Sequence, residues 1–218
     1  MNLVGKCPPS PDALAAAADR GFDNVELHLR PSDLDSVEAT AETVERSPVT
    51  ALSVHTLHAR PDDAEPFQRS NALADRLDAY LVVHSQYAQH THTAQLDAYD
   101  FTAPYGYENN PGMSAHSLQN LVLDRGHDLV LDTAHLYMAE PAYLDSLTGL
   151  LREYGDQIQV VHFTDGTSLE DGLAFGDGDI PIERTADILD SHFDGAVVLE
   201  VMPDEQADAR RRVLEWLD

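Results

Sequence analysis

The chain has 218 residues and carries 39 acidic residues against 13 basic ones, for a formal net charge of −26 at pH 7. Its 43% hydrophobic content excludes an intrinsically disordered chain, in which high charge accompanies few apolar residues. The single cysteine, Cys7, excludes an internal disulfide bond and a zinc site made of cysteines. Because the sequence shows neither a membrane-spanning apolar run nor a signal-peptide pattern, we expect a cytoplasmic protein without a membrane partner.

The surplus of acidic residues indicates adaptation to concentrated salt, in which counter-ions screen the repulsion within an acidic surface. Lys6 is the only lysine, and the other basic residues are arginines. This composition disfavours nucleic acid as a partner but leaves it open, because proteins of high-salt organisms are acidic whatever they bind. The net charge therefore indicates the salt concentration around the protein rather than the class of its substrate. It also leaves the oligomeric state undetermined.

Short apolar runs of strand length alternate with stretches of helical periodicity along the chain. The predicted strands are Asn2–Lys6, Asn24–His28, Val49–His55, Ala79–His84, Ala103–Glu108, Asp128–Asp132, Ile158–His162 and Ala196–Val201. The predicted helices are a first one from a Ser10 cap through Ala18, then Asp35–Arg46, Ala64–Leu77, Ser114–Arg125, Ala142–Tyr154, Ile182–Ser191 and Glu205–Leu217. The connection Gln86–Thr102 has weak periodicity, so we expect it to be irregular.

Alternating strands and helices predict a parallel sheet, and eight such units predict one closed (β/α)8 TIM barrel with short loops, a single domain over residues 1–218. An open, doubly wound sheet is the alternative fold. That fold usually has a glycine-rich nucleotide-binding loop after its first strand, where this chain reads Gly5-Lys6-Cys7-Pro8-Pro9. The closed barrel is therefore the better prediction.

Seven of the predicted strands end at or beside a histidine or a carboxylate. These residues are Glu26 with His28, His55, His84, Glu108, Asp132, His162 and Glu200. In a closed barrel such positions meet at the face where barrel enzymes have their active sites. Glu108, Asp132 and Glu200 could not all stay ionised in one cluster without a cation nearby. Oxygen and imidazole ligands without thiolate suit Mn²⁺, Zn²⁺, Co²⁺, Fe²⁺ or Mg²⁺, so we expect a bound divalent metal ion.

Five segments carry a family resemblance: Tyr107–Asn110, Leu131–His135, Val161–Asp165, Phe175–Ile180 and Val198–Val201. In this order they resemble the xylose isomerase-like TIM-barrel superfamily, which includes sugar-phosphate isomerases and epimerases, ketose 3-epimerases and type IV apurinic endonucleases. The resemblance covers the chain from about the second strand to the last. It implies a single-metal site made of Glu108, Asp132, His162 and Glu200.

The resemblance also suggests supporting roles for neighbouring residues. His135 would contact the substrate or support a metal ligand, and Asp165 would orient His162 or the loop after it. Ordinary loop capping is the alternative for Asp165 and for Asn109.

Lys6 could reach a substrate phosphate or carboxylate, or could form a structural ion pair. The turn Gly176–Gly178 could bind an anion through its N–H groups, or could merely shape a loop.

The resemblance implies a sugar or sugar-phosphate isomerase or epimerase. A ketose would be its small-molecule substrate, with Glu108 and Glu200 as acid and base next to a metal-bound carbonyl. The main alternative is a phosphodiesterase resembling the apurinic endonucleases, with His55 and His84 as ligands of a second metal rather than as substrate-hydroxyl binders.

The endonucleases carry an Asp-x-His pair that completes a third metal site. The corresponding segment here, Glu170–Phe175, has no histidine, which disfavours the nuclease. A barrel that binds a small ligand without catalysis is a further alternative, because fold alone does not fix function. The histidines at positions 58, 90, 92, 116, 127 and 192 lie away from the predicted strand ends, so we expect them to be structural.

Overall fold

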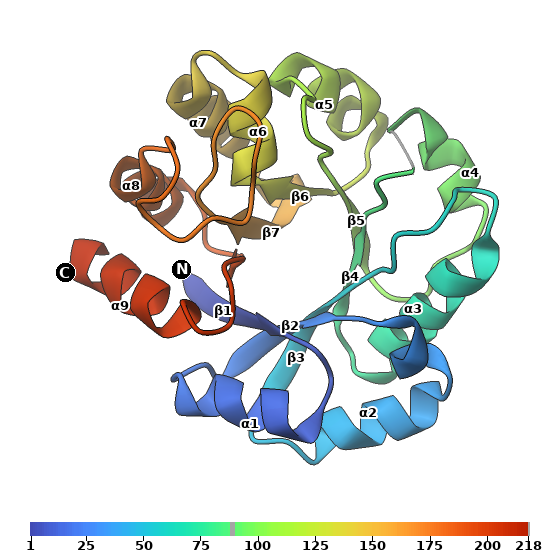
Figure 1. The fold of residues 1–218 in the computed structure, drawn as a ribbon. Helices are drawn as coiled ribbons and strands as arrows, with labels where there is room; N and C mark the ends of the chain where they lie inside the picture. The colour runs from blue at the N-terminus through green and yellow to red at the C-terminus, as the bar shows by residue number, and fades with distance from the viewer. Residues whose placement is uncertain (88–89, 218) are drawn as a thin grey trace. The chain divides into compact units, whose positions relative to one another are not determined.

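The computed structural model describes residues 1–87 and 90–217. Within these residues eight strands follow one another as neighbours in chain order and close into a barrel (Figure 1). They are β1 Asn2–Cys7, β2 Asn24–His28, β3 Thr50–His55, β4 Tyr80–Val83, β5 Tyr105–Glu108, β6 Leu129–Asp132, β7 Ile158–Phe163 and β8 Ala196–Leu199. The strand pairs are parallel, as in β2 with β3 and β6 with β7. The predicted (β/α)8 barrel is confirmed.

Helices connect the strands along the described chain. The α-helices are α1 Pro11–Asp19, α2 Val37–Glu45, α3 Ala64–Arg76, α4 Thr93–Asp97, α5 Ala115–Leu121, α6 Thr133–Ala139, α7 Tyr143–Tyr154, α8 Ile182–His192 and α9 Gln206–Leu217. Short 3-10 helices are η1 Pro31–Leu34, η2 His90–His92, η3 Leu123–Arg125 and η4 Gly155–Gln157. None of the described helices is long and apolar enough to span a membrane.

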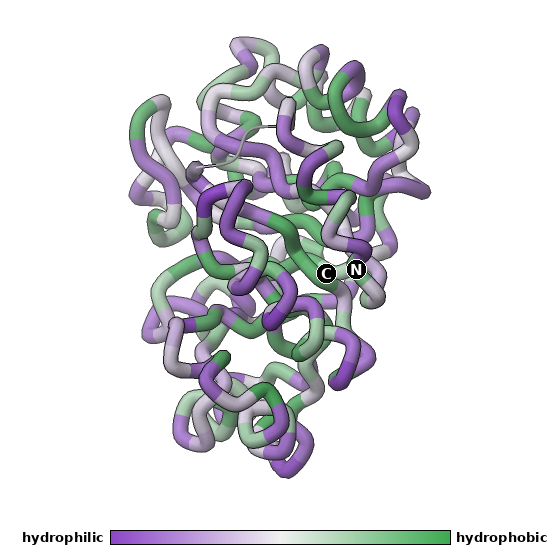
Figure 2. Tube along the Cα trace, turned by 90° about the vertical axis from the view of Figure 1, so that its right-hand side faces the viewer, coloured by the Kyte–Doolittle hydropathy of each residue, from purple (hydrophilic) through white to green (hydrophobic). Residues whose placement is uncertain are grey.

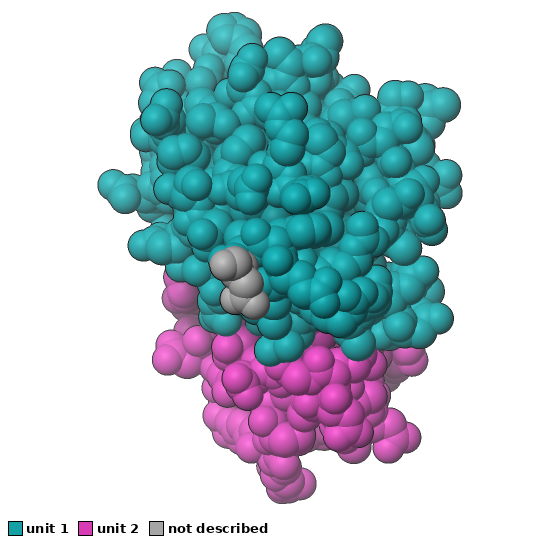
Figure 3. Space-filling model, turned by 90° about the vertical axis from the view of Figure 1, so that its left-hand side faces the viewer, with its two compact units in different colours: residues 1–3, 109–218 teal, residues 4–108 magenta. Residues whose placement is uncertain are grey.

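The chain divides into two compact units (Figure 3). The N-unit is residues 4–108, and the C-unit is residues 1–3 with 109–218. In the N-unit the helices α1, α2 and α3 lie outside the strands, and in the C-unit α7, α8 and α9 do so (Figure 1). The single domain over residues 1–218 stays a prediction.

Strand and helix burial follow from the residue patterns. All four residues of β6 and of β8 are buried, as expected for parallel strands covered on both faces. The helix α7 buries Tyr143, Leu147, Leu150 and Leu151, which share one helical face. Figure 2 shows the same alternation of hydrophobic and hydrophilic residues along the outer helices. Each unit therefore buries its strands beneath the apolar faces of its helices.

Serine caps begin several helices. Ser10 accepts a hydrogen bond from the Ala13 N–H, as its position before α1 predicts, and Ser114 does the same for α5. Two connections differ from expectation. The helix α6 was not predicted because its seven residues are too few for a clear periodicity. The connection Gln86–Thr102 contains η2 and α4, so its predicted irregularity is wrong for these residues, whereas positions 88 and 89 lie outside the described part of the chain.

Candidate metal centre

Strand register brings the predicted site residues to the carboxyl ends of neighbouring strands in each unit. In the N-unit His28 pairs with His55 across β2 and β3. In the C-unit Asp132 pairs with His162 across β6 and β7, and Phe163 pairs with Leu199, the residue before Glu200. Parallel pairing in register therefore places side chains from successive strands at the same edge.

The C-unit holds Asp132, His162 and Glu200 as one cluster. Their ligand atoms lie within 4.8 Å of one another. His162 is fully buried and Asp132 is 2% exposed, whereas the side chain of Glu200 is 30% exposed. The Nδ1 atom of His162 lies 2.9 Å from Oε2 of Glu200. Two carboxylates and an imidazole thus converge where little water can offset their charge, and Glu200 is the most open of the three.

Asn109 fixes the backbone of Asp132. Its Oδ1 accepts a hydrogen bond of 2.6 Å from the Asp132 N–H, and its Nδ2 donates one of 3.0 Å to the Asp132 carbonyl. The Asp132 carboxylate in turn accepts a hydrogen bond of 2.7 Å from the His135 N–H and so caps α6. Asn109 is fully buried, and its two hydrogen bonds hold the backbone at the end of β6 in place.

His135 is held between two acceptors. Its Nδ1 donates to the Asn109 carbonyl at 2.6 Å, and its Nε2 donates to Oδ2 of Asp171 at 2.9 Å. Because a carbonyl and an ionised carboxylate can only accept, both ring nitrogens carry protons and the ring is an imidazolium. The hydrogen bond from His135 lowers the pKa of Asp171, which keeps that carboxylate ionised. His135 is therefore a buried positive charge with its Nδ1 3.7 Å from Oδ1 of Asp132.

Asp165 organises the loop after β7. Its carboxylate is fully buried and accepts hydrogen bonds from four backbone N–H groups: Gly166 at 2.8 Å, Gly176 at 2.7 Å, Gly178 at 3.1 Å and Ile180 at 3.2 Å. Of its two predicted roles, the contacts support orientation of the loop. The same contacts explain the Gly176–Gly178 turn, because the anion that its N–H groups bind is the Asp165 carboxylate. This loop also carries Asp171, the partner of His135.

The N-unit holds a second cluster of His55, His84 and Glu108, whose ligand atoms also lie within 4.8 Å of one another. Oε2 of Glu108 lies 3.2 Å from Nε2 of His55 and 3.4 Å from Nδ1 of His84. The Nδ1 of His55 donates to the Thr56 carbonyl at 2.8 Å, and its Nε2 lies 3.3 Å from Nδ1 of His84. The three side chains therefore meet as one polar cluster of imidazole nitrogens and a carboxylate.

His58, which its position in the sequence led us to expect as a structural residue, is a neighbour of this cluster. Its ring centroid lies 5.8 Å from that of His55 and 5.0 Å from that of His84. Its Nδ1 accepts a hydrogen bond of 3.3 Å from the Gln86 N–H. Loss of hydration and the neighbouring His55 lower the pKa of His58, which favours the neutral ring. The spacing His-x-x-His after β3 was the signal that could have identified it.

Lys6 forms an ion pair inside the N-unit. Its Nζ lies 3.0 Å from Oε1 of Glu26, and Ser53 donates a hydrogen bond of 2.8 Å to the other carboxylate oxygen. Glu26 is fully buried and the side chain of Lys6 is 10% exposed. Of the two roles expected for Lys6, the contacts support the structural ion pair.

The sequence and the fold are similar to those of known proteins. Residues 14–218 match the model of a family described as xylose isomerase-like TIM barrel. No protein of curated function matches the sequence. Among solved structures, a D-tagatose 3-epimerase-like protein is 19% identical with a TM-score of 0.79, over 100% of this chain and 97% of that one.

Two further solved structures are similar in fold. A D-allulose 3-epimerase from Methylomonas sp., in complex with D-allulose, is 16% identical with a TM-score of 0.71, over 97% of this chain and 96% of its own. A 3-keto-D-glucoside 4-epimerase from E. coli is 12% identical with a TM-score of 0.71, over 100% of this chain and 98% of its own. At these identities the likeness establishes the fold.

Proposed function

The chain belongs to the xylose isomerase-like TIM barrel family, and from that premise we propose that it is a metal-dependent isomerase or epimerase of a sugar or sugar phosphate. The observation that carries the proposal is the cluster of buried Asp132 and His162 with the partly exposed Glu200 at the carboxyl ends of β6, β7 and β8. The sugar epimerases among its structural neighbours support the substrate class.

We propose Glu108 as the fourth ligand of the metal that Asp132, His162 and Glu200 hold. Glu108 ends β5, the strand before β6 in the barrel order, as Asp132 ends β6. The donor set fits a divalent ion such as Mn²⁺, Zn²⁺, Co²⁺ or Mg²⁺, because it consists of carboxylate oxygens and an imidazole nitrogen. Burial supports this fit, since clustered carboxylates with little hydration are unstable unless a cation offsets their charge.

A divalent ion held there would polarise a ketose carbonyl and offset the negative charge that develops on its oxygen. Glu200 is the candidate base, because its side chain is the most exposed of the C-unit cluster and can take a proton from the carbon next to the carbonyl. Glu108 is the candidate acid. Proton return to the opposite face of the same carbon gives epimerisation, and return to the neighbouring carbon gives aldose–ketose isomerisation.

His135 and Asn109 are positioning residues in this proposal. Asn109 sets the backbone of Asp132, and the His135 imidazolium lies beside the Asp132 carboxylate. Asp171 holds that imidazolium in place from the loop after β7. These contacts orient a metal ligand before any substrate arrives, which limits the reorganisation that catalysis requires.

Exchange of a carbon-bound proton tests the proposed function. Protein loaded with Mn²⁺ is incubated with D-fructose, D-tagatose or D-allulose in D₂O, and NMR follows the proton next to the carbonyl. We expect loss of that proton signal with the wild type and with Glu153→Gln, an exposed control on α7. We expect no exchange with Glu200→Gln. The test is repeated with protein loaded with Zn²⁺, Co²⁺ or Mg²⁺. If the wild type exchanges no proton with any of these ketoses or their phosphates under any of these metals, the proposed function is wrong.

The second candidate function is a two-metal phosphodiesterase, favoured by the cluster of His55, His84 and Glu108. Glu108 would then bridge two metals, as in other two-metal sites. The segment Glu170–Phe175 weighs against this candidate, because it lacks the histidine with which the resembling endonucleases complete a third metal site. Cleavage of bis(p-nitrophenyl) phosphate that is lost in His84→Ala would favour the phosphodiesterase.

A further inference from the structure

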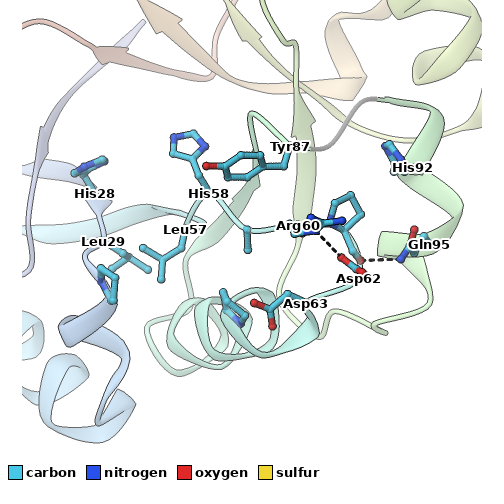
Figure 4. Close-up of a pocket in the computed structure, with 14 residues that line it drawn as sticks. His28, Leu29, Leu57, His58, Arg60, Asp62, Asp63, Tyr87, His92 and Gln95 are labelled. Atoms are coloured by element: carbon cyan, nitrogen blue, oxygen red, sulfur yellow. Dashed lines mark hydrogen bonds and ion pairs between the residues drawn. The ribbon is translucent and has the colours of Figure 1, made fainter.

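A hollow of about 1210 Å³ opens in the N-unit beside His58 (Figure 4). Its lining comes from the end of β2, from the segments that follow β2, β3 and β4, and from α3 and α4, all of which belong to the N-unit. Pockets for small-molecule ligands measure about 300–1,000 Å³. The hollow therefore has room for a whole small molecule.

One part of the lining is apolar. Its apolar residues include Leu29, Pro31, Leu57, Ala59 and Pro66. A second hollow of about 190 Å³ shares Pro31, Leu57 and Pro66 with the first, so the apolar surface continues toward η1 and α3. Covering such a surface removes it from water, which favours binding of a ligand with an apolar face.

Planar side chains form another part of the lining. Tyr87 is 56% exposed, and His58 and Arg60 are also exposed. The backbone of Tyr87 is fixed, because its N–H donates to Oγ of Ser85 at 3.2 Å and that hydroxyl donates to the Ala59 carbonyl. Phenol, imidazole and guanidinium planes are the groups on which the bases of nucleic acids stack in proteins. The lining therefore fits a flat aromatic ring.

Hydrogen-bonding groups of the lining define the edge of such a ring. Nδ1 of His58 accepts from the Gln86 N–H at 3.3 Å, so in the neutral ring Nε2 carries the proton and donates. The carboxylate of Asp63 makes no hydrogen bond to the first turn of α3 as the structure describes it, so it can accept one from a ligand. Gln95 is oriented by a hydrogen bond of 2.9 Å from its Nε2 to the Pro61 carbonyl. The matching ligand therefore carries both a donor and an acceptor on its edge.

The charge of the lining disfavours anionic ligands. The Arg60 guanidinium lies 3.3 Å from the Asp62 carboxylate, which offsets its charge. Asp63 adds a further negative charge to the lining. An acidic lining repels a phosphate group on a ligand. The hollow therefore fits a neutral heteroaromatic molecule better than a nucleotide.

We propose that the hollow binds a neutral nucleoside or its free base, whose aromatic ring stacks on Tyr87 and whose edge donates a hydrogen bond to Asp63 and accepts one from His58. The proposal adds a ligand site to the N-unit and does not rest on the proposed function, because it uses no residue of the C-unit cluster. A nucleoside and a free base share this chemistry and differ in the ribose, so a comparison of adenosine with adenine separates them.

Isothermal titration calorimetry of metal-loaded protein with adenosine, adenine and ribose tests the proposal. We expect adenosine or adenine to bind and ribose to bind at least tenfold more weakly, because ribose has no aromatic ring. Tyr87→Ala should weaken the binding of the base about tenfold, the loss expected for one stacked base. Tyr87→Phe should keep the affinity, as should Leu169→Ala, a control residue that is 91% exposed on the loop after β7.

Two further comparisons separate stacking from charge. Uridine and 5,6-dihydrouridine have the same hydrogen-bonding edge, but only uridine has an aromatic ring, so uridine should bind more tightly. Asp63→Asn keeps an oxygen that accepts a hydrogen bond and removes the negative charge. This substitution should leave adenosine binding unchanged and should raise the affinity for AMP above that of the wild type.

Four results would each overturn the proposal, whatever proton exchange on ketoses shows. They are no binding of adenosine, adenine or uridine, equal affinities for uridine and 5,6-dihydrouridine, an unchanged adenosine affinity in Tyr87→Ala with a wild-type circular dichroism spectrum, and an AMP affinity that Asp63→Asn does not raise. Ribose that binds as tightly as adenosine would also overturn it and would make the hollow a carbohydrate site.

Discussion

Gly178 lies where the loop after β7 folds back onto Asp165. A Cβ at this position would lie 2.3 Å from Oδ1 of Asp165 and 2.4 Å from the Gly166 carbonyl oxygen. Gly178→Ala must therefore displace the carboxylate from its N–H partners, and we expect a loss of about 2–4 kcal/mol in the free energy of unfolding. Denaturant unfolding measures this loss.

Gly149→Ala is the matched control for Gly178→Ala. Gly149 lies within α7, and a Cβ there would meet nothing within 4 Å. Alanine should stabilise this helix by about 0.5–1 kcal/mol. Equal effects of the two substitutions would contradict the role assigned to the Asp165 carboxylate.

The pH dependence of stability tests the Asp171–His135 pair. Because the folded protein lowers the pKa of Asp171, the pair stabilises the fold above the unfolded value of about 3.9 and loses this effect as the pH falls through the folded value. The side chain of Asp171 is 48% exposed, so we expect a contribution of about 1 kcal/mol or less.

The measurement compares unfolding of the wild type and Asp171→Asn from about pH 7 to about pH 3. The stability difference between them should be constant near neutrality and should vanish in acid. A difference that grows as the pH falls would show that Asp171 is not ionised in the fold. Asp177→Asn, an exposed change in the same loop, controls for effects of lost surface charge.

Single residues were predictable where strand position carries the information. His55, His84, Glu108, Asp132, His162 and Glu200 were predicted from the ends of apolar runs, and register explains why such residues gather within each unit. The pairing of His135 with Asp171 was not predictable, because Asp171 is 36 residues away in an irregular loop. Local sequence patterns do not predict which residues pair over such a separation.

At the level of elements, buried polar contacts join three neighbouring strands. Glu26 on β2 forms an ion pair with Lys6 on β1 and accepts a hydrogen bond from Ser53 on β3. Removing one charge of a buried pair leaves the other without its counter-charge, so Lys6→Met should cost about 3–5 kcal/mol in the free energy of unfolding. The double change Lys6→Met with Glu26→Leu should recover most of this loss. A double variant as unstable as Lys6→Met alone would mean that the loss comes from packing rather than from charge.

Element boundaries followed from periodicity, turn residues and caps. The predicted strand Asn24–His28 matches β2, and the predicted strand Ile158–His162 differs from β7 by one residue. Short helices escaped prediction because tertiary contacts stabilise them. Asp132 caps α6, and Asp97 of α4 accepts hydrogen bonds of 2.9 Å from Tyr105 and 2.6 Å from Tyr107 on β5. Such contacts exist only once the barrel has formed.

For the whole molecule, the net charge of −26 predicts a strong dependence of stability on salt. Raising KCl from about 0.1 M to about 2 M shortens the screening length from about 10 Å to less than 3 Å and weakens repulsion among the surface carboxylates. We expect the melting temperature to rise over this range, by similar amounts in KCl and NaCl. A melting temperature independent of salt would contradict the proposed adaptation to concentrated salt.

The metal content of purified protein, measured by elemental analysis in high salt, tests the proposed centre most directly. Wild type and His84→Ala should each hold one divalent ion per chain, whereas His162→Ala and Asp132→Asn should hold none while retaining the wild-type circular dichroism spectrum. Two ions that fall to one in His84→Ala would favour the phosphodiesterase. No metal in the reconstituted wild type, or a full equivalent in folded His162→Ala, would contradict the metal centre on which the proposed function depends.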